Sequence, residues 1–261
     1  MPTRRKFLTQ TAATVGAITV LPYAATGAGH SGALSLADGQ VTVHPISHAS
    51  FVMETPSGVV YVDTVGEASA YADMPAPDLI LITHEHGDHY NAELLAEIGG
   101  EAPILTNPAV FDMLPDGLKS RATAIGNGES TAVMDLGIDA IPAYNITEDR
   151  LKFHPQGRDN GYVMTVGGAR IYISGDTEGV PEMRALEDID VAFVCMNLPF
   201  TMGAQQAAEA VAEFAPTLVI PYHYRGRDGG TQNPAEFADL LAAAGAGSEV
   251  VMHDWYNGTL G

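Results

Sequence analysis

The sequence contains a single cysteine, and this scarcity excludes several kinds of site. Cys195 has no second cysteine in the 261 residues with which to pair, so no intramolecular disulfide framework holds the fold together. A structural zinc site built from several cysteines is excluded for the same reason. Metal ligands, if the chain has them, must come from its nine histidines and its carboxylates.

Positive charge is also scarce. The chain has 12 Lys and Arg residues against 32 Asp and Glu, which gives a net charge of −20. Phosphate binding needs clusters of basic side chains, and no cluster after residue 30 is longer than Arg225-Gly226-Arg227. A surface this acidic repels nucleic acid and anionic lipid. The composition therefore predicts no nucleic-acid partner.

The first thirty residues contain no acid, and their basic residues are confined to Arg4-Arg5-Lys6. An apolar stretch of small residues follows over 11–21, and further small residues occupy 22–28. The apolar stretch is shorter than the ~20 residues that a helix needs to cross a bilayer. A basic pair, a short apolar region and small residues in this order resemble a twin-arginine export signal.

This reading of the N-terminus predicts the organisation and location of the chain. Residues 1–30 are expected to be the signal peptide, and residues 31–261 one folded domain. The mature protein is expected in the periplasm or outside the cell, with no stable membrane anchor after signal cleavage. Twin-arginine signals are associated with proteins that fold before export, which suits a protein that takes up its metal inside the cell.

Short apolar segments alternate with turn signals through the rest of the chain, with no internal repeat. Segments rich in β-branched residues predict strands, and segments with helical spacing predict helices. Residues 78–83 are apolar almost throughout, which is typical of a strand buried on both faces. The expected strands are 41–44, 50–54, 59–63, 78–83, 104–106, 162–166, 169–174, 191–196, 218–221 and 249–253; the expected helices are 91–98, 204–214 and 234–244.

A cluster of metal-competent residues follows the buried strand 78–83. His84, His86, Asp88 and His89 all lie within six residues, before the helix predicted at 91–98. Two histidines separated by one residue can bind one ion from the same side of a turn, and an Asp with an adjacent His can face a second ion. Imidazole and carboxylate ligands suit zinc first, with manganese or iron as alternatives.

The pattern His-x-His-x-Asp-His resembles the signature of the metallo-β-lactamase superfamily. Three further features follow in the order typical of that superfamily. Asp63 resembles the aspartate that braces the histidine loop, Asp176 in Gly175-Asp176-Thr177 the aspartate between two metals, and His223 the last ligand. The resemblance implies an α/β fold, a four-layer αββα sandwich with the active site at one edge.

Within the superfamily, several segments are most similar to one branch. These are Ser47-His48-Ala49-Ser50-Phe51, Gly175-Asp176-Thr177, Leu198-Pro199-Phe200-Thr201-Met202 and Pro221-Tyr222-His223-Tyr224. The branch includes ascorbate-6-phosphate lactonase and N-acyl phosphatidylethanolamine phospholipase D. The resemblance implies a metal-dependent hydrolase that attacks an ester, lactone or phosphoester.

One departure from the family pattern concerns the first metal. Where the family carries a third histidine, this chain has Ile141-Pro142-Ala143-Tyr144-Asn145. His154 lies a few residues further on and is the candidate replacement; the alternative is a histidine at the rim of the site. Pro155 favours an extended backbone at His154, which helps its side chain to project inward.

The resemblance implies two divalent ions. His84, His86 and His154 would hold the first, Asp88, His89 and His223 the second, with Asp176 between them. Two such ions activate a shared water for hydrolysis. Asp88 and Asp176 would act directly in the reaction, Asp88 by accepting or relaying a proton, and Asp63 would orient the histidine loop.

Three further residues are candidate substrate contacts: His48, Tyr144 and Arg225. His48 precedes a strand and Arg225 follows His223 in a Gly-rich loop, where it can pair with a phosphate or carboxylate. Two other functions remain open. One is a mononuclear iron oxygenase of the same fold, and the other is a non-catalytic metal-binding protein. The number and identity of the bound ions distinguish the three.

Overall fold

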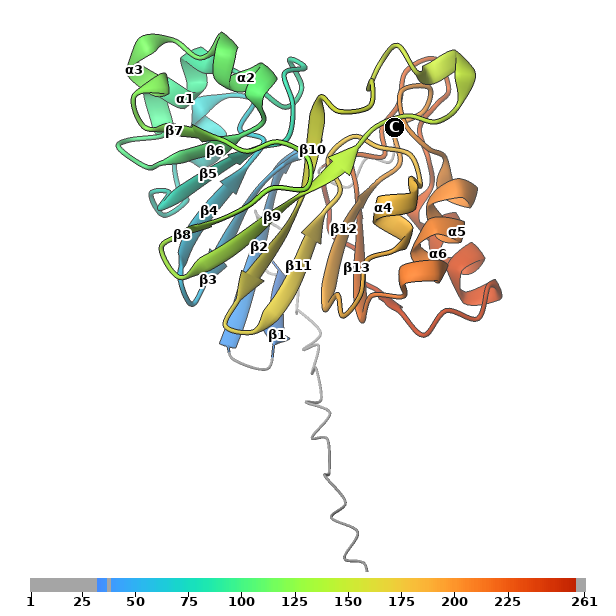
Figure 1. The fold of residues 1–261 in the computed structure, drawn as a ribbon. Coiled ribbons are helices and arrows are strands. Elements are labelled where there is room, and N and C mark those ends of the chain that lie inside the picture. Colours follow the sequence, from blue (N-terminus) through green and yellow to red (C-terminus); the bar gives the residue numbers. More distant parts are fainter. Residues whose placement is uncertain (1–31, 37–38, 257–261) are drawn as a thin grey trace, which may run out of the picture.

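The computed structural model describes residues 32–36 and 39–256, so the predicted signal peptide lies outside the described residues. The chain forms two seven-stranded sheets, one from each half of the sequence (Figure 1). The strands of the first sheet follow the sequence order from β1 to β7, and those of the second follow it from β8 to β14. Both sheets mix antiparallel and parallel neighbours.

The first sheet is antiparallel from β1 to β4 and parallel from β4 to β7. Asn91 and Asn107 begin α1 and α2 by accepting hydrogen bonds from the backbone N–H groups of Leu94 and Val110, as N-cap side chains do. The elements are β1 (Gly32–Leu36), β2 (Gly39–Ser47), β3 (Ser50–Thr55), β4 (Gly58–Val62), β5 (Leu79–Ile82), β6 (Ile104–Thr106) and β7 (Ala122–Ala124), with the 3-10 helix η1 (Ala68–Tyr71), α1 (Ala92–Ile98), α2 (Pro108–Met113) and α3 (Asp116–Lys119).

The second sheet is antiparallel from β8 to β11 and parallel from β11 to β14. Its elements are β8 (Ser130–Val133), β9 (Leu136–Ala143), β10 (Asp159–Val166), β11 (Ala169–Ile173), β12 (Val191–Cys195), β13 (Leu218–Tyr222) and β14 (Glu249–Val250), with the 3-10 helix η2 (Glu148–Arg150), α4 (Pro181–Arg184), α5 (Ala204–Phe214) and α6 (Pro234–Ala243).

The two sheets pack face to face, and the helices cover their outer faces on both sides (Figure 1). Phe51 of the first sheet and Phe193 of the second stack with ring centroids 4.5 Å apart, and both are fully buried. A second apolar cluster lies under α1, where Ile80 and Ile82 of β5 join Leu95. The architecture is the predicted αββα sandwich, and this prediction is confirmed.

Strand β14 ends earlier than the sequence predicts. The expected strand 249–253 is reduced to Glu249–Val250, and the chain then turns to bury Trp255 against Tyr222 and Phe51, at ring centroid distances of 5.7 and 5.8 Å. Burial of a large aromatic side chain stabilises this departure from the sheet edge.

The parallel strands place their carboxyl ends at one edge of the sandwich. Asp63 follows β4, His84 follows β5 and His223 follows β13. Sheet-based enzymes commonly place their chemistry at this edge, on loops that a rigid scaffold holds. Among the described residues, no helix is both long and apolar enough to span a membrane.

Candidate metal centre

The loop after β5 carries the histidine motif, and a buried carboxylate holds it. Asp63 accepts hydrogen bonds from the Thr83 backbone N–H, the Thr83 hydroxyl and His89 Nδ1, each 2.8 Å long. Both Asp63 and His89 are fully buried. Because the carboxylate holds the Nδ1 proton of His89, the ring can lose a proton only from Nε2, on the opposite side, and that nitrogen then offers the lone pair that a metal-ligating histidine requires.

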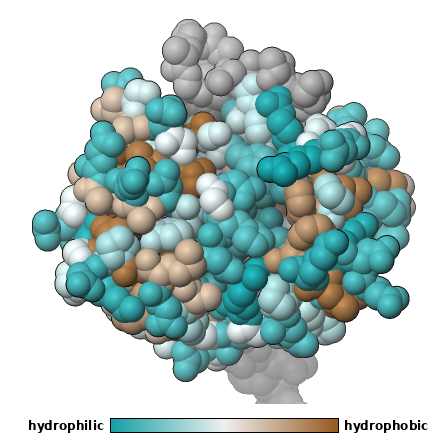
Figure 2. Space-filling model, turned by 90° about the horizontal axis from the view of Figure 1, so that it is seen from above, coloured by the Kyte–Doolittle hydropathy of each residue, from teal (hydrophilic) through white to brown (hydrophobic). Residues whose placement is uncertain are grey.

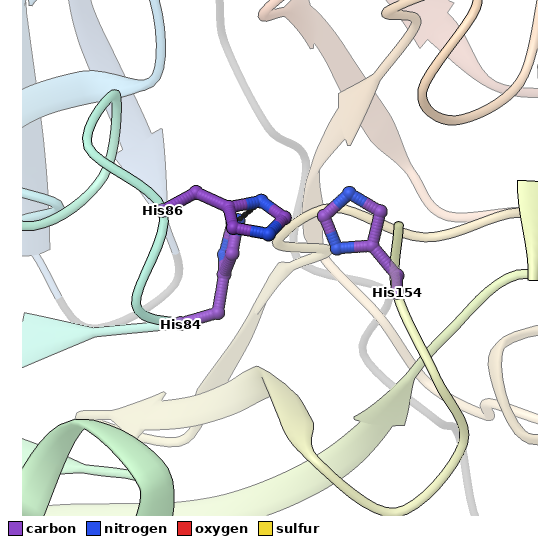
Figure 3. Close-up of side chains that lie close together, drawn as sticks. All are labelled: His84, His86 and His154. Carbon is purple, nitrogen blue, oxygen red and sulfur yellow. Dashed lines mark hydrogen bonds between the residues drawn. The ribbon is translucent and has the colours of Figure 1, made fainter. Parts of the chain in front are cut away.

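Three histidines form the first group of possible ligands. His84 and His86 come from the motif loop and His154 comes from the loop before β10; all three rings point toward a common centre (Figure 3). One nitrogen of each ring lies within 4.8 Å of those of the other two, and His84 Nε2 lies 3.1 Å from His86 Nδ1. The structure thus brings His154 to the position that the sequence left in question.

His154 is held by a carboxylate of its own. Its Nδ1 lies 2.9 Å from Asp159 Oδ2, and Arg158 donates to Asp159 Oδ1 at 2.6 Å. Arg158 also forms a 2.9 Å ion pair with Glu85, which lies between the two motif histidines. His154 Nε2 is buried and makes no hydrogen bond. The ring is therefore fixed with its unpaired nitrogen facing the other two histidines.

Asn145, in the segment where the resemblance predicts a third histidine, holds the loop that carries His154. Its side-chain amide donates to the carbonyls of Arg150 at 2.9 Å and Phe200 at 2.7 Å, and its backbone N–H donates to His154 O. Buried Glu178 ties down the same loop, because it accepts from the backbone N–H groups at 146 and 147 and pairs with Arg150 at 2.6 Å. The loop that carries His154 is thus well ordered by hydrogen bonds.

Tyr144 does not line the pocket. Its hydroxyl donates to Glu182 at 3.0 Å, and its backbone N–H donates to the Thr177 hydroxyl at 3.1 Å. These contacts direct the ring toward α4 rather than into the cavity, which argues against the predicted substrate contact.

The second group of possible ligands contains His89, His223 and Asp88. His89 Nε2 and His223 Nε2 lie 3.1 Å apart, and Asp88 Oδ2 lies 3.8 Å from His223 Nε2. His48 joins this group, since its Nε2 is 3.5 Å from Asp88 Oδ2 and its ring packs edge-on against that of His223. The Nδ1 of His48 lies 3.0 Å from the hydroxyl of Tyr256.

Asp176 lies between the two groups. Its Oδ1 is 3.2 Å from His223 Nε2 and 3.4 Å from His89 Nε2, and its Oδ2 is 3.4 Å from His154 Nε2. Gly175 makes this approach possible: it has a φ of +59°, and a Cβ there would lie 2.7 Å from Asn160 O. One carboxylate therefore presents an oxygen to each group.

These residues fit divalent metal ions. His154 Nε2 and Asp176 Oδ1 are buried without hydrogen bonds, and leaving such groups unsatisfied costs free energy. Imidazole nitrogens and carboxylate oxygens are the ligands that zinc, manganese and iron accept. A cation between them would satisfy the lone pairs that the fold gathers at this point.

Burial and neighbouring charge set the protonation of the histidines. Burial holds the pKa of His84 well below its usual range and lowers that of His86, so both rings are neutral and can bind metal at pH 7. Burial alone would also lower the pKa of His89, but the carboxylates of Asp176 and Asp63 outweigh it and raise that pKa to about 9. The protein thus favours positive charge at the second group.

Three of the seven non-glycine residues with a positive φ in the described part of the chain lie at this site. His48, Asp63 and His223 have φ values of +58°, +46° and +49°, in the left-handed region that residues other than glycine seldom adopt. Strain of this kind is characteristic of functional sites that the surrounding structure holds in place.

A cavity of about 740 Å³ opens over the two groups of ligands. The top view in Figure 2 shows mainly hydrophilic residues at the centre of that face and separate groups of hydrophobic residues on either side. The lining residues are His48, His86, Gly87, Asp88, Phe153, His154, Asp176, Asn197, Phe200, Arg225, Gly226 and Arg227. His48 and Arg225, two of the candidate substrate contacts, are among these residues.

The sequence did not single out several residues of this site. The side-chain nitrogen Nδ2 of Asn197 lies 3.0 Å from His223 Nε2. The carboxylate of Asp159 orients the ring of His154. A buried acid next to an arginine, as in Arg158-Asp159, is a weak signal that becomes meaningful only when the fold shows the histidine beside it.

Comparisons with known proteins agree with this geometry. The family model described as "Beta-lactamase superfamily domain" matches residues 42–223. The chain is 32% identical over 211 residues to a UPF0173 metal-dependent hydrolase of Pyrococcus abyssi, across 77% of this chain and 92% of the relative. It is 29% identical over 219 residues to one of Thermococcus kodakarensis, across 81% and 96%.

Solved structures show the same fold. A protein of Parabacteroides distasonis, assigned as a metal-dependent hydrolase, superposes with a TM-score of 0.76 at 35% identity, over 88% of this chain and all of that one. The metallo hydrolase Igni18 of Ignicoccus hospitalis superposes with a TM-score of 0.66 at 23% identity, over 81% and 94%. The chain belongs to the metallo-β-lactamase superfamily and, within it, to the UPF0173 metal-dependent hydrolases.

Proposed function

We propose that this protein is an exported hydrolase that uses two divalent ions to cleave an ester, lactone or phosphoester of a small molecule. The observation that carries the proposal is the position of Asp176, whose two oxygens face separate groups of ligands. A carboxylate in this position can contact two ions at once and hold them close enough to act on one substrate.

The proposed roles of the residues are metal binding and proton transfer. His84, His86 and His154 would hold one ion, Asp88, His89 and His223 the other, with Asp176 between them. When bound, two ions lower the pKa of water and polarise the oxygen of the group under attack. Burial would raise the pKa of Asp88, but His48 and the histidines around it lower it. Asp88 is therefore a carboxylate at neutral pH and can accept a proton from the attacking water.

Zinc is the metal we propose first, because histidine-rich sites with one or two carboxylates suit it, although manganese and iron accept the same ligands. The segments around His48, Asp176, Leu198 and His223 support the branch that includes ascorbate-6-phosphate lactonase and N-acyl phosphatidylethanolamine phospholipase D. We therefore expect lactones and phosphodiesters to be better substrates than β-lactams.

A mononuclear iron oxygenase of the same fold is the competing function. His84, His86 and His154 form a group that could hold the single iron of such an enzyme. The second group of ligands supports the hydrolase, since Asp88 and His223 would have no metal to bind in an enzyme with one ion.

Metal content and hydrolysis test the proposal together. The purified protein is analysed for zinc, manganese and iron and then screened on esters, lactones, phosphodiesters, thioesters and β-lactams. We expect two ions per chain and turnover of at least one oxygen ester or lactone. The variant His86→Ala should remain folded but lose both the bound metal and the hydrolytic activity. One iron without hydrolysis would favour the oxygenase, and no metal at all would favour a non-catalytic protein.

Export is a separate part of the proposal, supported by Arg4-Arg5 and the short apolar stretch after it. Replacing both arginines by lysine should trap the precursor in the cytoplasm, because the twin-arginine pathway depends on that pair. Fractionation of cells that express the two forms measures this. Equal export of the variant would contradict the twin-arginine assignment while leaving the hydrolase proposal intact.

A further inference from the structure

The pocket concentrates positive charge in a protein that has little of it. Only nine Lys and Arg residues follow residue 30, against 32 acids, yet both Arg225 and Arg227 line the cavity. The other two arginines near the centre are engaged with acids, since Arg158 pairs with Asp159 and Glu85, and Arg150 pairs with Glu178. Within the described part of the chain, Arg227 has no acidic partner within ion-pair distance.

The loop that carries these arginines is built tightly into the fold. Gly226 and Gly230 pack against the Leu198 carbonyl so closely that a Cβ on either would overlap it. Gly230 N donates to Arg227 O at 2.7 Å, and Gln232 N donates to Tyr224 O at 2.8 Å. The arginine loop and the loop that carries Phe200 therefore pack together, and the fold fixes the backbone from which the two guanidinium groups project.

Aromatic rings accompany the arginines. The guanidinium of Arg225 lies 4.2 Å above the ring of Tyr256, and that of Arg227 lies 5.9 Å from the ring of Phe200. Phe200 contacts Phe153 edge to face, with ring centroids 5.0 Å apart. Both phenylalanines also line the cavity. A cation over a ring face is restricted in position, and the guanidinium of Arg227 can still donate its N–H groups to an oxyanion.

The chain connects these groups to the metal centre. Arg225 lies two residues after His223, and Phe153 directly precedes His154. The phenylalanines and the arginines line the same cavity as His86, His154 and Asp176, so a molecule that contacts them lies beside the proposed ions. We propose that the substrate is an amphiphilic anion: a carboxylate or phosphate held by Arg225 and Arg227, joined through a short apolar part, packed on Phe153 and Phe200, to the bond that is cleaved. The inference rests on the proposed hydrolase function.

A pair of esters tests the selectivity. The protein is assayed on neutral 4-nitrophenyl butyrate and on the mono-4-nitrophenyl ester of glutaric acid, which has a free carboxylate. In Arg227→Gln we expect the ratio of kcat/KM for the anionic ester to that for the neutral one to fall about tenfold, mainly through KM, because one charge-assisted hydrogen bond is lost. Arg227→Glu should lower the ratio further.

The matched control is Lys119, another cation that lies over a phenyl ring, that of Phe111 at 4.8 Å, but outside the cavity. Lys119→Gln and Lys119→Glu change the net charge equally and should leave the ratio unchanged. If the Arg227 and Lys119 variants give the same ratio, or if Arg227→Gln lowers turnover of both esters equally, the arginines only balance the acidic centre and the proposal is wrong.

Equilibrium binding separates this proposal from the hydrolase function. Phenyl phosphate and 4-phenylbutyrate are titrated into the protein by calorimetry at two salt concentrations, and we expect Arg227→Gln to weaken binding about tenfold. Arg-dependent binding without hydrolysis of any ester would support the anion site and contradict the hydrolase. Hydrolysis of an ester, together with ligand binding that Arg227→Gln leaves unchanged, would support the hydrolase function and contradict the anion site. Preference for one ligand over the other distinguishes a phosphate from a carboxylate substrate.

Discussion

The two halves of the proposed metal centre are assembled in different ways. The first sheet supplies four candidate ligands from one segment, His84 to His89, and one carboxylate, Asp63, braces it. The second sheet supplies three ligands, His154, Asp176 and His223, from three separate loops. The difference shows that one half depends on local sequence, whereas the other depends on the tertiary fold to bring distant residues together.

The brace of the first half should give the largest effect. Asp63→Ala leaves two buried donors of Thr83 and one of His89 without an acceptor, so the free energy of unfolding should fall by about 3–5 kcal/mol. Both ions should be lost, because the whole motif loop loses its anchor. Chemical denaturation and metal analysis measure the two effects. Asp73→Ala, at an exposed position, is the control. An Asp63→Ala variant with full metal content would show that the loop does not need this brace.

The brace of the second half should act on one ion only. Asp159→Asn weakens the hold on His154 and the ion pair with Arg158, so affinity for the first ion should fall about 10- to 100-fold, the usual effect of losing a carboxylate that orients a histidine ligand. The second ion should remain, because His89 and His223 are held elsewhere. Competitive titration with a chelator resolves the two steps. Equal loss of both ions would mean that the halves are not independent.

The contrast between the halves also explains what the sequence predicted. The motif His84 to His89 and the buried strand before it are local patterns. With the order of Asp63, Asp176 and His223 they carry the resemblance to the superfamily, and that resemblance implied the αββα sandwich. Strand β9 was missed, although its residues alternate in burial, because Gly137 and Pro142 are typical of turns. Its pairing with β10 along seven residue pairs compensates for both.

The residues that support the second half carry no local signal. Asp159 and Arg158 look like an ordinary charged pair in a loop, and Phe153 and Phe200 look like isolated apolar residues. They matter because the loop 145–158 folds over the end of β10 and meets the motif loop. His154 could be named as a candidate from its distance along the chain, but only the tertiary structure shows its nitrogen beside those of His84 and His86.

The smallest predicted effect concerns the contact between the halves. The ion pair of Glu85 with Arg158 at 2.9 Å joins the motif loop to the His154 loop, and both side chains are partly exposed, so it should contribute only about 0–1 kcal/mol. Glu85→Gln should therefore change affinity for the first ion less than Asp159→Asn does, and a double-mutant cycle with Arg158→Gln measures the coupling. A coupling near zero means that each half is positioned by its own brace. A coupling above about 1 kcal/mol, together with a large loss of the first ion, would mean instead that the two loops form the first site as one unit.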